Sequence, residues 1–285
     1  MRFCHVTEAS VPEETGRLLA EACANRGIAF SSVEGKSFDF DPAKRLQPGD
    51  LLYRGAVTTA AARAEAFLYS EGVSTFYAQP DGIYFTVVTP PLTHERFGVP
   101  IPKTFYLAGS DPRLLESMVE RVGGFPVVLK VLGRSSGVGV MLVDSMPSLL
   151  SVLEYALAQG ANPLLCQFIA NATHWRLIVV GETVVGHYKN RHRMGDFRTD
   201  GSRDPADFTT AVPAVVATAA VRAVASLHLE FGGVDVLEDP AGSPYVLEAN
   251  FPCYYAQAQL VVGVDIAGAM VDHLVRKAGR LSAAP

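Results

Sequence analysis

The sequence Gly232-Gly-Val-Asp-Val-Leu-Glu238, followed after a turn by Tyr245-Val-Leu-Glu-Ala-Asn-Phe251, decides the expected fold of this chain. The turn is rich in Pro, Gly and Asp, so the two runs together predict a β-hairpin. A symmetric hairpin places Asp235 opposite Glu248, with Asn250 two residues further on and on the same face. Opposed carboxylates among apolar residues repel one another unless a cation lies between them. The alternative interpretation is a pair of acids on a solvent-facing hairpin.

A second pattern lies in Phe125-Pro-Val-Val-Leu-Lys130 and the glycine-rich loop of residues 133–139. Lys130 interrupts an apolar strand, and a buried ammonium must reach water or meet an anion. The loop can present backbone N–H groups and the hydroxyls of Ser135 and Ser136 to phosphates. The alternative is a hairpin with a flexible tip and a lysine that reaches solvent. The spacing does not match a Walker A loop, because no Gly-Lys-Ser/Thr ends it.

A third pattern is the run from Thr173 to Arg191, in which Gly181-Glu182 predicts a two-residue turn. This turn would place Arg176 opposite His187 and His174 opposite Lys189. From His174 to Arg198 there are five Arg or Lys residues against two acids, so one face of this hairpin is expected to be basic. Like charges directly opposite destabilise a hairpin unless an anion lies between them. A solvated charged face is the alternative.

These three patterns complement one another. The hairpin offers only a few oxygen donors, which suits a magnesium ion that nucleotide phosphates also bind. The lysine and the basic hairpin suit the phosphates themselves. The whole chain has a net charge of −5, which gives no indication of binding to nucleic acid or to an anionic membrane. The anion site must therefore be local. Together the patterns predict a site for a nucleoside triphosphate and magnesium.

The remaining sequence predicts the architecture and the compartment. The first ninety or so residues alternate strands with helices and predict a small parallel sheet. The expected strands are residues 3–6, 28–33, 50–53 and 73–77, with helices at 12–26 and 58–70. Antiparallel α+β material follows, with helices at 112–122, 213–230 and 265–277. The four scattered cysteines, the lack of a signal-like start and the lack of a long apolar run favour a cytoplasmic protein without a membrane span.

From about Val99 to Lys277 the sequence resembles the ATP-grasp superfamily, and within it the RimK-like and LysX-like carboxylate–amine ligases. Lys130 and the loop after it resemble the nucleotide lysine and the mobile phosphate-covering loop. Gly195-Asp-Phe-Arg198 resembles the segment that reaches phosphate and substrate. The hairpin carboxylates with Asn250 resemble the ligand set for two magnesium ions. Gly263-Val-Asp-Ile-Ala-Gly268 opens a final helix, as in those relatives.

The resemblance implies an α/β N-terminal pre-ATP-grasp domain followed by an α+β ATP-grasp domain made of two subdomains. We expect the N-terminal domain at residues 1–93, the central subdomain at 94–165 and the C-terminal subdomain at 166–285. The implied cofactors are ATP and Mg²⁺, with two ions expected and Mn²⁺ as an alternative. The implied metal ligands are Asp235, Glu248 and Asn250. The implied catalytic residues are Arg191, Arg176 and Arg198. The implied nucleotide-binding residues are Lys130, Ser135, Ser136, Gly137, Gln167, Phe168, Ile169, His174 and Lys189.

The sequence departs from the family pattern at several places, three of which concern nucleotide binding. The hinge strand that meets adenine reads Cys166-Gln167-Phe168 in place of Gln-Glu-Tyr. His174 replaces an acidic residue that often touches ribose in RimK-like enzymes. A second nucleotide-binding lysine, usual on a helix before the Gly-Val-Pro-Ile-Pro stretch, is missing. Arg54, at the end of an N-terminal strand, is either a substrate contact or a charged strand end.

The implied reaction joins a carboxylate to an amine. The carboxylate attacks the γ-phosphate of ATP, an acylphosphate forms, and an amine then displaces phosphate. The partners are a small-molecule or peptide carboxylate and an amine, without nucleic acid or membrane, and a homodimer is compatible. Two other functions fit the same residues: an ATP-grasp small-molecule kinase and a non-catalytic nucleotide-binding regulator.

Overall fold

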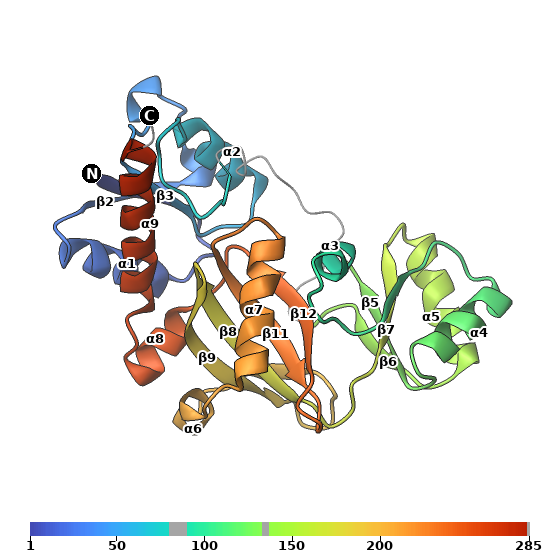
Figure 1. Cartoon of the computed structure of the whole chain (residues 1–285). Helices are drawn as coiled ribbons and strands as arrows, with labels where there is room; N and C mark the ends of the chain where they lie inside the picture. The colour runs from blue at the N-terminus through green and yellow to red at the C-terminus, as the bar shows by residue number, and fades with distance from the viewer. Residues whose placement is uncertain (80–89, 133–136, 284–285) are drawn as a thin grey trace.

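Three β-sheets organise the computed structural model, which describes residues 1–79, 90–132 and 137–283 (Figure 1). A three-stranded sheet and its helices form the N-terminal part. A four-stranded sheet lies at the opposite end of the molecule, and a five-stranded sheet lies between the two. This arrangement agrees with the expected α/β region followed by α+β material.

The N-terminal sheet is parallel, in the order β2-β1-β3. Its strands are β1 (Arg2–Thr7), β2 (Ala29–Glu34) and β3 (Leu51–Arg54), and its helices are α1 (Glu13–Ala24) and α2 (Thr59–Leu68). Short 3-10 turns occupy η1 (Gly35–Ser37) and η2 (Pro42–Lys44). The prediction of a fourth strand at 73–77 was wrong. Ser74 and Tyr77 make only isolated bridges, a parallel one to Leu51 and an antiparallel one to Leu229.

The four-stranded sheet is antiparallel, in the order β4-β7-β5-β6. Its strands are β4 (Thr104–Tyr106), β5 (Val127–Val131), β6 (Val140–Val143) and β7 (Pro163–Gln167). Helices α4 (Pro112–Arg121) and α5 (Met146–Ala158) bury one face, where Leu115 and Leu149 pack with Leu129 and Leu165. Because side chains alternate along a strand, Lys130 points to the other face, away from these helices.

The five-stranded sheet is antiparallel, in the order β10-β9-β8-β11-β12. Its strands are β8 (Thr173–Val180), β9 (Thr183–His192), β10 (Thr199–Gly201), β11 (Phe231–Glu238) and β12 (Pro244–Asn250). Helix α7 (Ala214–Ser226) covers one face, and its Val216 and Ala220 pack on Trp175, Leu177 and Val236. The other face carries the candidate site at its polar end.

Shorter helices join these parts. They are α3 (Pro90–Arg96), α6 (Pro205–Thr209) and α8 (Ala256–Val262). His94 Nδ1 on α3 lies 2.8 Å from Ser226 Oγ, which fixes α3 to the end of α7. In the parts of the chain that the structure describes, no helix is long and apolar enough to cross a membrane.

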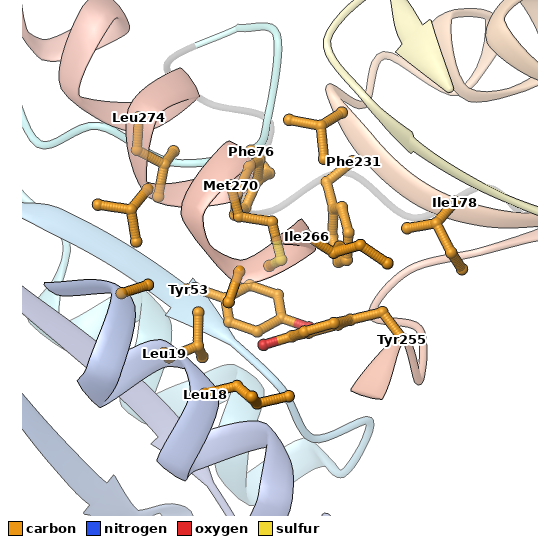
Figure 2. Close-up of a cluster of buried hydrophobic side chains, with 14 of the residues drawn as sticks. Leu18, Leu19, Tyr53, Phe76, Ile178, Phe231, Tyr255, Ile266, Met270 and Leu274 are labelled. Carbon is orange, nitrogen blue, oxygen red and sulfur yellow. The ribbon is translucent and has the colours of Figure 1, made fainter. Parts of the chain in front are cut away.

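The N-terminal and C-terminal regions share one hydrophobic core (Figure 2). Leu18, Leu19 and Tyr53 from the N-terminal region pack with Phe231 and with the long terminal helix α9 (Ile266–Ala283). The expected boundary at residues 93 and 94 falls inside α3, and the one at 165 and 166 falls inside β7. The three-part division remains a proposal. It follows the three sheets, but its first and third parts share a core.

Candidate functional site

The β11–β12 hairpin has the predicted central pairing. Asp235 is directly opposite Glu248, and a register shift follows between Asp235 and Val236. The Asn250 amide Nδ2 donates to Glu248 Oε1 at 2.8 Å, so Asn250 and Glu248 lie together. Asp235 is buried, whereas the Glu248 side chain is 45% exposed. Three side chains with oxygen donors therefore gather at one end of the five-stranded sheet.

Two basic side chains of β8 hold Asp235. Arg176 Nη1 donates to Asp235 Oδ2 at 2.6 Å, and His174 Nε2 lies 3.2 Å from Oδ1. Burial alone would raise the pKa of Asp235, but Arg176 and His174 outweigh it and lower this pKa to about 2. Asp235 is therefore ionised at neutral pH, despite its burial.

Gly233 makes room for the Arg176 side chain. A Cβ at position 233 would lie 2.7 Å from Arg176 Cζ and 2.8 Å from the Cβ of Cys253. Real Cβ atoms do not approach other heavy atoms this closely. The glycine in the sequence Gly-Val-Asp thus lets the guanidinium lie against β11 beside the carboxylate.

Lys130 brings the four-stranded sheet to this cluster. Its Nζ donates to Glu248 Oε2 at 3.1 Å, across 118 residues of sequence. The Lys130 side chain is 26% exposed, so the pair lies at the surface between the two sheets. The residue predicted to bind phosphate and the residue predicted to bind metal are therefore in direct contact.

The predicted register of the β8–β9 hairpin was wrong beyond its first residue pairs. Val179 faces Val184 as expected, but a register shift between Ile178 and Val179 moves the rest by one residue. A slip of one residue turns each side chain to the opposite face. Lys189 consequently lies opposite Trp175, with its Nζ 4.9 Å from the indole ring centre. This is the face away from Asp235, so we leave Lys189 out of the candidate site.

Acidic side chains balance most of the positive charge expected on this hairpin. Arg191 pairs with Asp207 at 2.5 Å and with Asp204 at 2.7 Å. Arg193 pairs with Asp200 at 2.7 Å, and Arg198 pairs with Asp196 at 2.5 Å. Asp200, Asp204 and Asp207 follow directly after the counted segment. They compensate most of its positive charge.

Arg198 also contacts the end of the glycine-rich loop. Its Nη1 donates to the Gly137 carbonyl oxygen at 3.2 Å. Ser135 and Ser136, expected to bind phosphate, lie outside the described residues. Of the loop residues assigned to nucleotide binding, Gly137 is the one that the structure places, and it lies beside Arg198.

The expected hinge residues lie at the end of β7 and directly after it. The Gln167 backbone N–H donates to the Lys103 carbonyl oxygen at 2.9 Å. The Phe168 ring lies edge-on to the Phe197 ring, with centroids 6.3 Å apart. Ile169 comes next and is half-buried. These residues occupy the connection between the four-stranded and five-stranded sheets, where Figure 1 shows the chain passing from β7 to β8.

The side chain of Arg54 is held by contacts inside the protein. Its Nε donates to Glu65 Oε2 at 2.8 Å, and its Nη2 lies 3.3 Å from the Tyr77 hydroxyl. The guanidinium also lies 5.7 Å from the centre of the Phe251 ring. Since the Glu65 side chain is 2% exposed, this is a buried ion pair and not an open substrate contact.

Two residues near Asp235 have no counterpart in the predicted set. Thr199 Oγ1 lies 2.5 Å from His174 Nδ1, and Asn190 Nδ2 lies 3.3 Å from His174 Nε2. Both are brought to His174 by the register of β8, β9 and β10. The one-residue shift in β8–β9 is not visible in the sequence, so no sequence signal pointed to them.

The donor set fits a hard divalent cation. It offers carboxylate oxygens from Asp235 and Glu248 and the amide oxygen of Asn250, which are the donors that magnesium prefers. Within residues 1–79, 90–132 and 137–283, no group of three His, Cys, Asp or Glu side chains is placed to hold a metal ion. The candidate set therefore depends on Asn250 and on ligands from a bound substrate.

Known proteins are similar to this chain in fold and in sequence. The fold is that of the ATP-grasp proteins: the RimK domain ATP-grasp protein of Sphaerobacter thermophilus superimposes with a TM-score of 0.68 at 25% identity, covering 96% of this chain and 99% of that one. The ATP-grasp ligase PsnB, solved with a minimal precursor, Mg and ADP, has a TM-score of 0.68 at 16% identity, covers 97% of each chain and shares the fold.

The family model for the RimK-like ATP-grasp domain matches residues 93–274, and this chain belongs to that family. A curated relative, a probable alpha-L-glutamate ligase of Picosynechococcus sp., is 34% identical over 186 residues. The match covers 64% of this chain and 60% of that relative.

Proposed function

We propose that the protein is an ATP-dependent carboxylate–amine ligase that forms an amide or peptide bond through an acylphosphate and releases ADP and phosphate. The observation that carries the proposal is the contact of Lys130 with Glu248, beside Asp235 and Asn250. A phosphate-binding cation and a set of oxygen donors are thereby brought together from two sheets of an ATP-grasp fold. Membership of the RimK-like family supports this assignment.

Asp235, Glu248 and Asn250 would hold magnesium. We expect two ions, with manganese as a substitute. Bound there, the metal would neutralise the triphosphate and stabilise the charge that develops during phosphoryl transfer. Because the ionised Asp235 is already fixed by Arg176 and His174, it requires little rearrangement to serve as a ligand.

The nucleotide would lie between the two ATP-grasp sheets. Lys130 would bind its phosphates, and this requires exchange of Glu248 for phosphate as the partner of the ammonium. The loop with Ser135, Ser136 and Gly137 would cover the phosphates. Gln167, Phe168 and Ile169 would meet the adenine. The contact of Gly137 with Arg198 supports a loop position near the phosphates.

Arg198 and Arg176 would act on the reacting groups. Arg191 shares a face of β9 with Lys189, away from Asp235, and pairs with Asp204 and Asp207, so by the same argument we do not include it. The substrate carboxylate oxygen attacks the γ-phosphorus, the bond to the β–γ bridging oxygen breaks, and ADP leaves. The amine nitrogen then attacks the acyl carbon, phosphate leaves, and the nitrogen loses a proton. Arg198 must exchange its aspartate partner for phosphoryl or acylphosphate oxygens. Among the residues that the structure describes, the buried Nε–H of Arg176 has no hydrogen-bond partner, so part of its guanidinium could serve a ligand.

L-Glutamate is the first substrate to test, because the curated relatives are named alpha-L-glutamate ligases. The proposed partners are a small-molecule or peptide carboxylate and an amine. The cytoplasmic location and the homodimer remain predictions.

Phosphate release from ATP across an array of acids, each with and without amines, tests the proposal. A ligase releases phosphate only when a matching acid and amine are both present. A kinase forms ADP with a hydroxyl substrate and does not need the amine. Glu248→Gln should abolish turnover, since it removes a charged ligand. Failure with every pair would favour the non-catalytic regulator.

A further inference from the structure

His174 joins three strands of the five-stranded sheet. It lies on β8, its Nδ1 meets Thr199 Oγ1 of β10 at 2.5 Å, and its Nε2 meets Asp235 Oδ1 of β11 at 3.2 Å. The His174 side chain is 13% exposed, as is that of Asp235. The imidazole thus lies largely inside the protein, with both ring nitrogens already in hydrogen bonds.

The partners define which nitrogen of His174 donates. Asp235 is ionised and can only accept, so Nε2 carries the hydrogen that faces it. In the neutral ring Nδ1 then accepts from the Thr199 hydroxyl. Asn190 Nδ2 lies 3.3 Å from Nε2, so under this assignment the Asn190 amide would have to exchange the positions of its nitrogen and oxygen to accept from that N–H. The result is a chain of hydrogen bonds from Thr199 through His174 to Asp235.

We propose that His174 is a positioning residue that holds the carboxylate of Asp235 for metal binding, and that Thr199 fixes the orientation of its ring. The inference rests on the proposed function, since it needs Asp235 to be a metal ligand. Partners of this kind orient metal-binding side chains in many proteins, and their loss weakens metal binding about 10- to 100-fold. Here a histidine on one side and Arg176 on the other fix the two oxygens of Asp235.

This role differs from the ribose contact that the family resemblance implies for position 174. A ribose hydroxyl would need a free ring nitrogen, but Thr199 and Asp235 use both. The two roles give opposite results for two ligands. Loss of a positioning residue weakens metal binding, whereas loss of a ribose contact weakens nucleotide binding without metal.

Both affinities can be measured without turnover. Mn²⁺ binding at saturating ADP is followed by electron paramagnetic resonance of free Mn²⁺, and ADP binding in EDTA is followed by calorimetry. We expect His174→Ala to weaken Mn²⁺ binding about 10- to 100-fold and to leave ADP binding in EDTA within about twofold of wild type. His174→Gln, whose amide can still donate to Asp235, should recover most of the loss.

Thr199→Val keeps the shape of the side chain and removes the hydroxyl, so it should weaken Mn²⁺ binding in the same direction but less. It also provides the test if His174→Ala does not fold, as judged by circular dichroism. His187→Ala is the matched control, because His187 lies opposite Leu177 on the face of β9 away from Asp235, where its Nε2 is 2.9 Å from the Thr210 carbonyl oxygen. It should bind both ligands like wild type.

Two results would overturn the inference in different ways. Unchanged Mn²⁺ binding with weakened ADP binding in EDTA would assign His174 to ribose and leave the metal site standing. A wild-type protein that binds no Mn²⁺ with ADP would overturn the metal site itself, and with it the proposed function.

Discussion

Lys130 Nζ lies 3.1 Å from Glu248 Oε2, so the four-stranded and five-stranded sheets meet through a phosphate-binding candidate and a metal-binding candidate. In this contact the two charges neutralise one another. In the proposed complex, two stronger contacts would replace this one: the Lys130 ammonium would bind a phosphate, and the Glu248 carboxylate would bind the metal. We therefore expect the pair to link the binding of the two ligands.

Lys130→Met should lower the affinity for ADP about 10- to 100-fold, because a charge-assisted hydrogen bond contributes about 1.5–3 kcal/mol. The free energy of unfolding should change by less than about 1 kcal/mol, since the partly exposed pair contributes little to stability. Calorimetry with ADP and urea unfolding measure both. Lys189→Met is the matched control and should bind ADP like wild type, because Lys189 lies over Trp175. Equal losses in the two variants would contradict the site.

Gly233→Ala should destabilise the protein by about 1–3 kcal/mol, as expected for overpacking. The added methyl group would collide with Arg176 and Cys253. Urea unfolding measures the loss. Gly109→Ala is the control, because a Cβ there meets nothing within 4 Å. If both variants were as stable as wild type, the close approach of Arg176 to β11 would be wrong.

Glu65→Ala should cost about 3–5 kcal/mol of unfolding free energy, because it leaves Arg54 without its buried partner. Thermal and urea unfolding give the value. Glu21→Ala breaks the exposed pair with Arg17 and should change stability by less than about 0.5 kcal/mol. If Glu65→Ala lowered the free energy of unfolding no more than Glu21→Ala, the buried ion pair would be contradicted and a substrate contact by Arg54 would again be open.

The stability of the N-terminal sheet should depend on acid pH through Asp50. Burial raises the pKa of this carboxyl, but hydrogen bonds from Arg2 and from the Gln47 N–H outweigh it and lower the pKa overall. The folded-state pKa is then below the unfolded one, so the stabilisation is complete above about pH 4 and is lost as pH falls through the folded-state value.

Asp50→Asn should consequently be less stable than wild type at pH 7, and the difference should shrink as the pH falls below about 4. Urea unfolding at a series of pH values measures it. Glu34→Gln, at an exposed position on β2, is the control. A difference between Asp50→Asn and wild type that stays constant down to low pH would show that the charge of Asp50 is not the cause.

The sequence predicted those parts of the site that depend on short-range patterns along the chain. The facing of Asp235 and Glu248 follows from a turn flanked by two alternating strands, and Lys130 follows from one charge in an apolar strand. The cross-strand partner of Arg176 could not be predicted, because the register shift between Ile178 and Val179 changes the partners of Ile178 and of the residues before it on β8 by one position. The aspartate partners of Arg191 were missed because α6 folds back onto β9. The core shared by Leu19 and Met270 depends on packing between distant segments, which no local pattern encodes.

The central claim is that the protein activates a carboxylate with ATP. Its most direct test uses an acid with isotopically labelled carboxylate oxygens, taken with its amine from the substrate screen, and mass spectrometry of the released phosphate. The account predicts that the phosphate carries a labelled oxygen from the acid, because the acylphosphate transfers that oxygen with the phosphoryl group. Phosphate released without label, or ADP formed without free phosphate, would contradict it.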